Sequence, residues 1–393
     1  MTAKTIFASL AVVSVAGLGL YNYHPGFRTE VNSILGIIDH DTVTTEESLD
    51  TVYYENTVSE NYEKDTNKPK KKLKPDRFTV LDQYAKNTPK IHEKDIQTLA
   101  NYLLLKAKSE EDKARLVFSW IATHVKYDAA GYNSGNYGDC SATAVLKRKT
   151  AVCEGYSELF KELGIAMGLK VEKITGYAKG YGYDDGQDFS DVNHAWNVAQ
   201  IDGKWKLMDV TWGSGYGETK NNKLVSVTKF DPWWFNTAPT EFIFSHLPSD
   251  AKWQMAGTQI TLGQFAKLPD IGSEFFLLGF SSRQMYTMAV SGKVTEFAEA
   301  YPNDFPLTAV QLPFTKHLNR GEKCKFIIKS DYAEEISLID DETWIPLVKN
   351  GTEFSAEYAP KGKKLTIASK VDKGGNWSIF IKYDIKNKTD NIK

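Results

Sequence analysis

The spacing of apolar residues predicts three helices in the first half of the folded region. Apolar residues recur at helical intervals in the segments 96–103, 109–121 and 156–163. Ser109, with an aspartate three residues later, is a capping-box-like start for the second segment. Glycines at 164 and 168 are stop signals for the third segment, whose first turn would contain Cys153.

Two strands joined by a tight turn are predicted next. Segments 194–201 and 204–212 are rich in Trp and Val, and Asp202-Gly203 between them is a two-residue hairpin signal. If these two residues form the loop, the residues on either side of it are paired. His194 then lies diagonally opposite Asp209 on one face of the sheet, roughly 7–8 Å away. A register shift of one residue would put them on opposite faces, so the spacing is informative.

The last part of the chain has a different pattern. From Lys323 onward, short alternating segments are separated by Gly, Asn and Asp turns. This pattern predicts an all-β sandwich of immunoglobulin-like type, and a small barrel fits it equally well. The predicted strands are 326–328, 336–339, 344–348, 353–358, 365–367 and 377–383.

Length and composition divide the chain and exclude some function classes. With 393 residues the chain can hold two domains plus extensions. A net charge of -2 gives no electrostatic reason to expect a nucleic-acid partner. The predicted parts are an N-terminal targeting segment, a flexible polar linker, a catalytic domain, a connecting region and a β-sandwich, at residues 1–24, 25–77, 78–255, 256–320 and 321–393.

The N-terminus is typical of an export signal. Lys4 precedes an apolar run from Ile6 to Leu20, and Ser14-Val15-Ala16 resembles a cleavage site. The apolar stretch up to Tyr23 is almost long enough to span a bilayer, so an N-terminal membrane anchor is the alternative to a cleaved signal peptide. Both readings predict an extracytoplasmic location, secreted or anchored to the membrane.

Cys153, His194 and Asp209 are the residues that suggest chemistry. Thiol acyl transfer needs a thiolate nucleophile, a base that holds its proton and a third group that orients the base. A helix N-terminus at Cys153 would favour the thiolate, because unpaired N–H groups and the helix dipole stabilise an anion there. The predicted hairpin would bring the other two side chains together.

The short sequence motifs around these residues resemble the transglutaminase-like superfamily, and in particular its kyphoscoliosis-peptidase branch. The chain itself is expected to be an exported bacterial protein. The similarity extends roughly from residue 78 to 280, and several motifs in the same order are more specific than any one of them. It implies a papain-like α+β catalytic domain in which Cys153 is the nucleophile, His194 the general base and acid, and Asp209 the orienting carboxylate. Family members often have glycine where this chain has Ala151. The motifs are Val117–Asp128, Cys153-Glu154-Gly155-Tyr156, His194-Ala195-Trp196-Asn197 and Asp209-Val210-Thr211-Trp212-Gly213.

The predicted function is a cysteine-dependent acyl-transfer enzyme, a peptidase or amidase that works through a thioester. Transglutaminase-type cross-linking shares every step up to the thioester, and a non-catalytic surface binding or assembly module is the alternative from another class. The expected partner is a peptide or protein substrate, with cell-wall or surface proteins as candidates; the oligomeric state is left open. No cofactor and no metal are expected. Weak candidates for substrate contacts are Trp120, Tyr127, Trp196 and Trp212, and the first two are also weak candidates for the second oxyanion donor.

The other cysteines and histidines are expected to be structural. Cys140 and Cys324 are predicted to be small buried hydrophobes, with a bridge between them as a minority alternative. His124 and His246 occur in family-like frames and are expected to act as structural hydrogen-bonding groups.

Overall fold

A computed structural model describes residues 76–184, 188–303, 305–372 and 374–387. The predicted targeting segment and all but the end of the predicted linker lie outside these residues. Within the described part of the chain, no helix has both the length and the apolar character needed to cross a membrane.

The first described part is helical, and short polar side chains define where its helices begin. Asp76, Asp95, Ser109, Asp128 and Ser141 each accept a hydrogen bond from the backbone N–H three residues later, as N-cap residues do. The elements are α5 (Arg77–Lys86), η2 (Lys90–His92), α6 (Ile96–Leu104), α7 (Glu110–His124), α8 (Ala129–Ser134), α9 (Ala142–Arg148) and α10 (Cys153–Ala166). The three helices predicted from the apolar spacing correspond to α6, α7 and α10.

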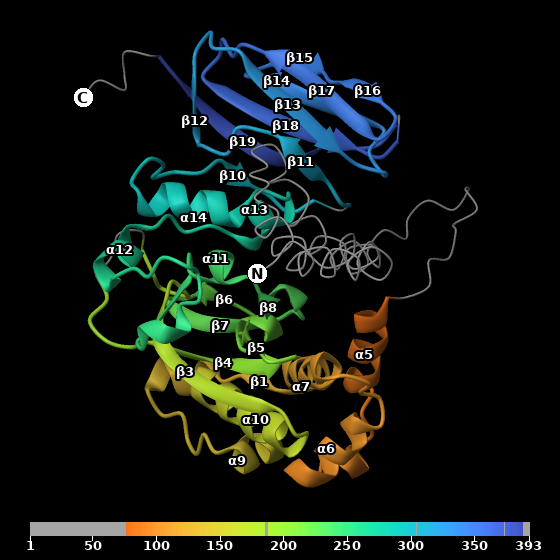
Figure 1. Ribbon diagram of the computed structural model, residues 1–393, viewed down its shortest axis with the longest axis vertical. Coiled ribbons are helices and arrows are strands. Elements are labelled where there is room, and N and C mark those ends of the chain that lie inside the picture. Colours follow the sequence, from red (N-terminus) through yellow and green to blue (C-terminus); the bar gives the residue numbers. More distant parts are fainter. Residues whose placement is uncertain (1–75, 185–187, 304, 373, 388–393) are drawn as a thin grey trace, which may run out of the picture. The chain divides into compact units, whose positions relative to one another are not determined.

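An antiparallel sheet packs against these helices (Figure 1), and its strand order is β8-β5-β4-β3-β9. The predicted hairpin is confirmed: Ile201 pairs with Lys204, and Asn197 pairs with Met208. The second strand is shorter than predicted, because β5 ends at Met208 and the chain then turns into a 3-10 helix. The strands are β3 (Lys170–Ala178), β4 (His194–Ile201), β5 (Lys204–Met208), β8 (Phe235–Thr237) and β9 (His246–Pro248).

Short elements connect this sheet with the helices. A two-stranded parallel pair holds the start of α10, and an antiparallel ribbon, β6–β7, follows the turn after β5. These elements are β1 (Lys126–Tyr127), β2 (Thr150–Ala151), η3 (Trp212–Ser214), β6 (Gly215–Lys220), β7 (Lys223–Thr228), η4 (Pro232–Trp234), α11 (Pro239–Phe242) and η5 (Ala251–Trp253).

Strand β4 is buried on both faces, which makes it the centre of this helix-and-sheet domain. Ala199 and Ile201 belong to the core shared with the helices, whereas Trp196 and Val198 belong to a cluster on the opposite face. The side chain of Asn197 points to the helical layer and donates to the carbonyl of Ser157 in α10. This bond fixes the helix that carries Cys153 to the strand that begins with His194.

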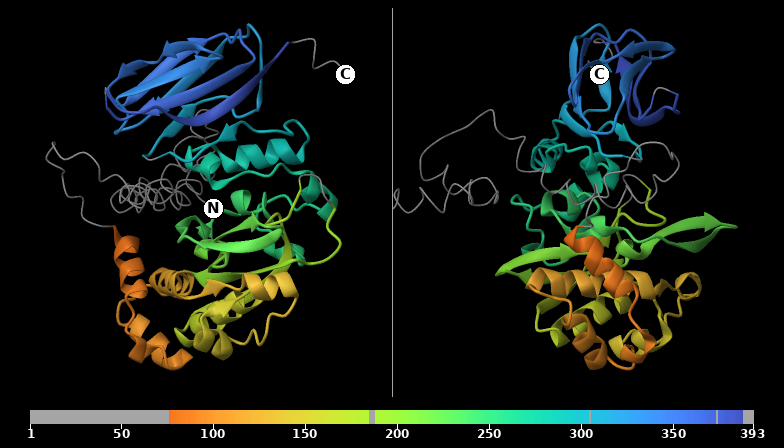
Figure 2. Two further views of the ribbon diagram at one scale, coloured as in Figure 1. Left: turned by 180° about the vertical axis from the view of Figure 1, so that it is seen from behind. Right: turned by 90° about the vertical axis from the view of Figure 1, so that its right-hand side faces the viewer.

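The C-terminal part is all β, as predicted, and three short helices that were not predicted precede it. One of its sheets has the order β10-β19-β18-β14-β15 with β12 beside β19, and the other has the order β11-β13-β17-β16 (Figures 1 and 2). Phe326 and Tyr383 meet between the sheets with ring centroids 6.4 Å apart. Strands β10, β11 and β12 precede residue 321, so the sheets begin earlier in the chain than the predicted domain boundary. The immunoglobulin-like topology stays a prediction.

The helices of this part are α12 (Leu262–Lys267), α13 (Ser273–Leu277) and α14 (Ser282–Val290). The strands are β10 (Glu299–Ala300), β11 (Thr308–Gln311), β12 (His317–Asn319), β13 (Cys324–Lys329), β14 (Glu335–Asp340), β15 (Thr343–Pro346), β16 (Val348–Asn350), β17 (Glu353–Tyr358), β18 (Lys364–Lys370) and β19 (Ser378–Lys386).

A buried ion pair holds α5 against α7. The guanidinium of Arg115 donates two hydrogen bonds to Asp82, at 2.8 and 2.7 Å, and the hydroxyl of Ser119 donates a third. The Arg115 side chain is 4% exposed and lies over the rings of Phe78 and Phe235. Removing one partner would therefore leave the other charge buried and unpaired.

We expect Asp82→Ala to lower the free energy of unfolding by about 3–5 kcal/mol, because Arg115 loses its counter-charge in a site closed to water. Urea denaturation followed by tryptophan fluorescence measures this loss. The matched control is the double variant Asp82→Leu with Arg115→Met, which removes both charges and should recover most of the stability. Equal losses in the single and double variants would contradict the role given to this pair.

Candidate active site

Cys153 is the first residue of α10, as the sequence predicts. Its N-cap, Val152, offers no side-chain acceptor to the free N–H groups of the first turn, so these groups are available to an anion. The parallel pairing of Tyr127 with Ala151 fixes the chain just before the helix. Gly155 lies in the first turn because a Cβ there would come within 2.8 Å of the Ala151 and Val145 side chains.

His194 and Asp209 form a direct hydrogen bond. The ring atom Nε2 of His194 lies 2.8 Å from Oδ2 of Asp209, whose side chain is fully buried. The other carboxylate oxygen, Oδ1, accepts from the backbone N–H groups of Thr211 and Trp212 at 2.9 and 3.1 Å. Since Nε2 is bound to the carboxylate, Nδ1 is the ring nitrogen left for proton transfer on His194.

A second histidine binds the same carboxylate. His246, at the start of β9, places Nε2 3.1 Å from Oδ2 of Asp209, and its Nδ1 lies 2.8 Å from the hydroxyl of Ser245. Its expected structural role is therefore a contact with the carboxylate that also binds His194. Sequence reasoning did not find that contact, because strand pairing over some 40 residues was needed to see it. The family-like frame of His246 was the one available signal.

Burial and these bonds set the charges of the three groups. Burial alone would lower the pKa of His194, but the Asp209 carboxylate outweighs it, with a smaller contribution from Cys153, and raises this pKa to about 10. Burial opposes ionisation of Asp209 as well, yet the two histidines hold its pKa well below the ordinary value. Burial lowers the pKa of His246 to about 4, so that its ring is neutral at pH 7. One charged and one neutral histidine thus share one carboxylate.

Aromatic rings enclose this group. His246 stacks on Phe242 with centroids 4.1 Å apart, and Trp212 lies 4.4 Å from the same imidazole. Trp212 also contacts His194, at 5.7 Å. Such walls keep water from the carboxylate and so strengthen its interaction with the imidazolium.

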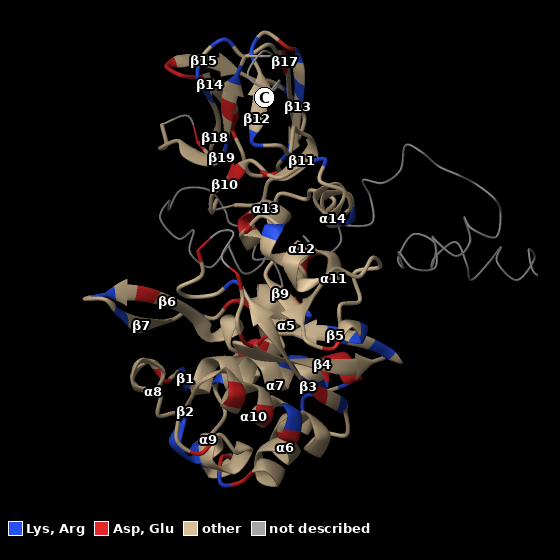
Figure 3. Ribbon diagram, turned by 90° about the vertical axis from the view of Figure 1, so that its left-hand side faces the viewer, with Lys and Arg blue, Asp and Glu red and all other residues tan. Residues whose placement is uncertain are grey.

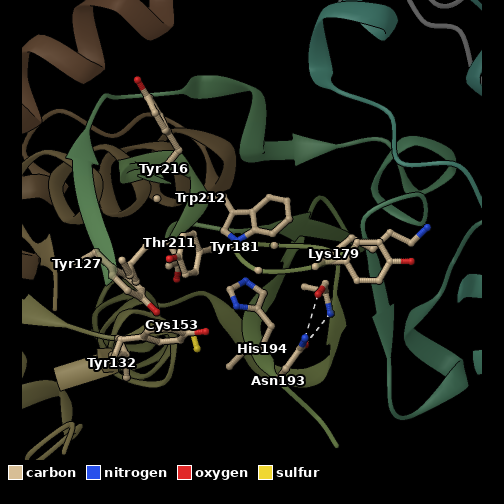
Figure 4. A pocket seen from close by; sticks show the side chains of 18 of the residues that line it. Tyr127, Tyr132, Cys153, Lys179, Tyr181, Asn193, His194, Thr211, Trp212 and Tyr216 are labelled. Atoms are coloured by element: carbon tan, nitrogen blue, oxygen red, sulfur yellow. Dashed lines mark hydrogen bonds between the residues drawn. The ribbon is translucent and has the colours of Figure 1, made fainter. Parts of the chain in front are cut away.

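Cys153 and His194 line one cleft of about 1260 Å³ (Figure 4). Of the weak substrate-contact candidates, Tyr127 and Trp212 also line this cleft. Trp120 and Trp196 do not: they are at most 1% exposed, and Trp120 stacks on His124 at 4.7 Å. Their positions therefore give no support to a contact with substrate, or to Trp120 as an oxyanion donor.

The three cysteines are free thiols, so the minority alternative of a Cys140–Cys324 bridge is not found. Both residues are partly rather than fully buried, contrary to the expectation of small buried hydrophobes. In the described part of the chain, one group of side chains has a spacing that could hold a metal ion, namely His194, Asp209 and His246. An ionised carboxylate can only accept, so both Nε2 atoms donate to Asp209, and a metal would have to displace these protons. Hydrogen bonding satisfies the group without an ion.

Comparison with known proteins supports the family resemblance seen in the sequence. Residues 97–210 match the family model of the transglutaminase-like superfamily. The chain contains a transglutaminase-like domain. Human kyphoscoliosis peptidase is 32% identical over 57% of this chain and 34% of its own length, which supports the branch inferred from the motifs. Hillarin of Drosophila melanogaster is 30% identical over 52% of this chain and 26% of its own length.

The chain thus spans about a third of the length of the first relative and about a quarter of the second. A solved structure described as a TGase is 24% identical, covers 48% of this chain and 43% of its own, and has a TM-score of 0.24. The matched segment contains Cys153, His194 and Asp209 and ends just after Asp209.

The raised pKa of His194 predicts how stability depends on pH. A histidine whose pKa is higher in the folded state stabilises the fold fully below its unfolded pKa, about 6.5, and this stabilisation is lost as pH rises toward the folded value, about 10. Asp209 is ionised in both states over that window. We expect the stability difference between the parent protein and Asp209→Asn to shrink from pH 6 to pH 10. Urea denaturation measures this difference, with both proteins carrying Cys153→Ser so that no thiol titrates. A constant difference across these pH values would show that the two groups are not coupled.

Proposed function

We propose that this protein is a cysteine-dependent acyl-transfer enzyme that acts on peptide or side-chain amide bonds through a thioester. The observation that carries the proposal is the His194–Asp209 hydrogen bond, at 2.8 Å, in the cleft where the first turn of α10 presents Cys153. A structural scaffold has no need of a buried carboxylate that keeps an imidazole charged beside a thiol.

In the proposed reaction the Cys153 thiolate attacks the amide carbonyl carbon and forms the C–S bond. The imidazolium of His194 gives its Nδ1 proton to the departing amine as the C–N bond breaks. Asp209 holds the ring through Nε2 throughout and stabilises its charged form. Water, or a second amine, then attacks the thioester while Nδ1 accepts its proton. The thiol leaves as the thiolate, and the imidazolium is restored.

The tetrahedral intermediate needs donors for its oxyanion. The backbone N–H of Cys153 is one, because it belongs to the open first turn of α10. We assign the second to the phenol of Tyr127. Burial raises the pKa of Tyr127, and the nearby Cys153 raises it further, so the hydroxyl keeps its proton. Figure 4 shows its side chain directed toward Cys153.

Cross-linking is the second candidate, since only the resolving nucleophile differs. Similarity to kyphoscoliosis peptidase favours hydrolysis. An extracytoplasmic location and a peptide or protein substrate at the cell surface belong to the same proposal, on the strength of the apolar N-terminal run. The binding-module alternative predicts no turnover at all.

We expect Cys153 to react with iodoacetamide well below pH 7, because a charged His194 stabilises the thiolate. The measurement is the pH dependence of alkylation in the Cys140→Ser, Cys324→Ser variant of the residues 76–393, and His194→Ala should remove the reactivity at low pH. The pKa of an isolated cysteine thiol is about 8.5. An alkylation rate that rises only near this pH, and that is the same in His194→Ala, would contradict the enzyme proposal. Release of free amine from a peptide library, against incorporation of a labelled amine, then separates hydrolysis from cross-linking.

Replacing Tyr127 by Phe should slow acyl transfer about 100- to 1,000-fold, the usual effect of losing one oxyanion donor. Alkylation by iodoacetamide forms no oxyanion and serves as the internal control, so its rate should stay unchanged. A fall in both rates would point to damage at Cys153. No fall in acyl transfer would remove Tyr127 from the oxyanion site.

A further inference from the structure

The β6–β7 ribbon, whose strands extend away from the sheet, has a register that is fixed by its turn (Figures 2 and 3). Asn221 and Asn222 both have positive φ, 53° and 60°, as a two-residue type I′ turn requires, and Lys220 pairs with Lys223 on either side of it. Because hydrogen-bonded and non-bonded pairs alternate in an antiparallel ladder, residues 216, 218 and 220 bond to β7. The N–H and C=O groups of residues 215, 217 and 219 then point outward from β6.

The outer edge of β7 is already occupied. Asn133 of α8 donates from Nδ2 to the carbonyl of Leu224 at 2.9 Å and accepts from its N–H at 3.0 Å. Its side-chain amide thus does what a neighbouring strand would do. These bonds also confirm the register, since Leu224 faces outward on β7 as the alternation requires.

The outer edge of β6 is open. Within the described part of the chain, the N–H of Gly215 already donates to the carbonyl of Trp212, whereas the outward N–H and C=O of Gly217 make no hydrogen bond. Both residues line the cleft that contains Cys153 and His194. The charged side chains of the strand, Glu218 and Lys220, lie toward the tip. Charges of this kind discourage strand pairing there, and the inner half of the edge has none.

We propose that an extended segment of the polypeptide substrate pairs with the open edge of β6 as an added strand, which carries its scissile amide to Cys153. This rests on the proposed function, because the occupant is the substrate of that reaction. Main-chain pairing would give affinity for strand-like segments of many sequences, and side-chain pockets would select among them.

Tyrosines around the cleft supply such pockets. Tyr132, Tyr181 and Tyr216 line the cleft and are 41%, 39% and 52% exposed. The side chain of Tyr181 packs against the ribbon, with its hydroxyl 3.1 Å from the Thr219 hydroxyl. Exposed phenol rings favour contact with apolar, aromatic and proline side chains. The preferred segment is therefore unfolded or strand-like, with such side chains at alternate positions.

The test compares Gly217→Pro with Gly217→Ala. Both substitutions add a Cβ, which would lie 2.4 Å from Cδ1 of Leu224 and 3.3 Å from the Tyr181 ring, but only proline removes the outward N–H. The N–H of Gly217 makes no hydrogen bond to β7, and proline is tolerated on a strand edge where the N–H faces outward. The probes are a library of pentapeptidyl vinyl sulfones and, as the small reagent, iodoacetamide. Both are used on Cys153 in the Cys140→Ser, Cys324→Ser variant.

We expect the best pentapeptidyl probe to label Gly217→Pro about 2- to 12-fold more slowly than Gly217→Ala, the effect of one net hydrogen bond. Iodoacetamide should label both variants equally. N-methylation of the probe at successive amides should slow labelling at every second position. Equal labelling rates for the two variants would overturn the pairing. An effect of N-methylation that does not alternate along the probe would overturn it too. So would a library in which no member reacts faster than methyl vinyl sulfone.

The failure of the edge proposal is distinguishable from failure of the proposed function. If iodoacetamide reacts at low pH in a His194-dependent manner and the two Gly217 variants do not differ, the enzyme proposal stands and the β6 pairing falls. If the low-pH reactivity is absent in the parent protein, the enzyme proposal falls, and the β6 pairing that rests on it falls with it.

Discussion

The buried carboxylate of Asp209 is the constraint on which the site depends. An ionised group that is closed to water is stable only when hydrogen bonds satisfy it, and this one has four donors. Two come from the turn that follows β5, one from the start of β4 and one from the start of β9. Strand β3 lies between β4 and β9 in the sheet, so the carboxylate joins strand ends that are not all neighbours. The ionised carboxylate therefore has all four donors only when the strands are arranged in this order.

The two histidines on Oδ2 have different functions because their surroundings differ. His246 is fully buried between Phe242 and Trp212, where an added positive charge would be costly, so it donates as a neutral ring. His194 lies at the cleft with its second nitrogen free of the carboxylate, so the negative charge of Asp209 acts on it. A neutral donor to Asp209 stabilises the carboxylate without competing for the proton that His194 would transfer in the proposed reaction.

Much of this site follows from local sequence patterns. The Asp202-Gly203 turn fixes a hairpin register in which His194 and Asp209 come together, and the apolar spacing after Cys153 fixes the helix that presents it. What local patterns could not give is contact across the sheet. The bond from His246 depends on the pairing of β9 with β3, which has no turn signal to announce it. The burial of Trp120 and Trp196 likewise depends on how α7 and β4 pack, which motif positions do not encode.

The β6–β7 ribbon is different, because its Asn221-Asn222 turn is a local signal, yet the ribbon is not among the predicted elements. Its place in the chain has a consequence for catalysis. Trp212 donates its N–H to Asp209, and β6 begins three residues later, at Gly215. A substrate strand held by β6 would therefore be held by the same short segment that anchors the carboxylate. Because a fixed separation between bound substrate and catalytic groups favours reaction, this continuity would align the scissile amide with Cys153 and His194.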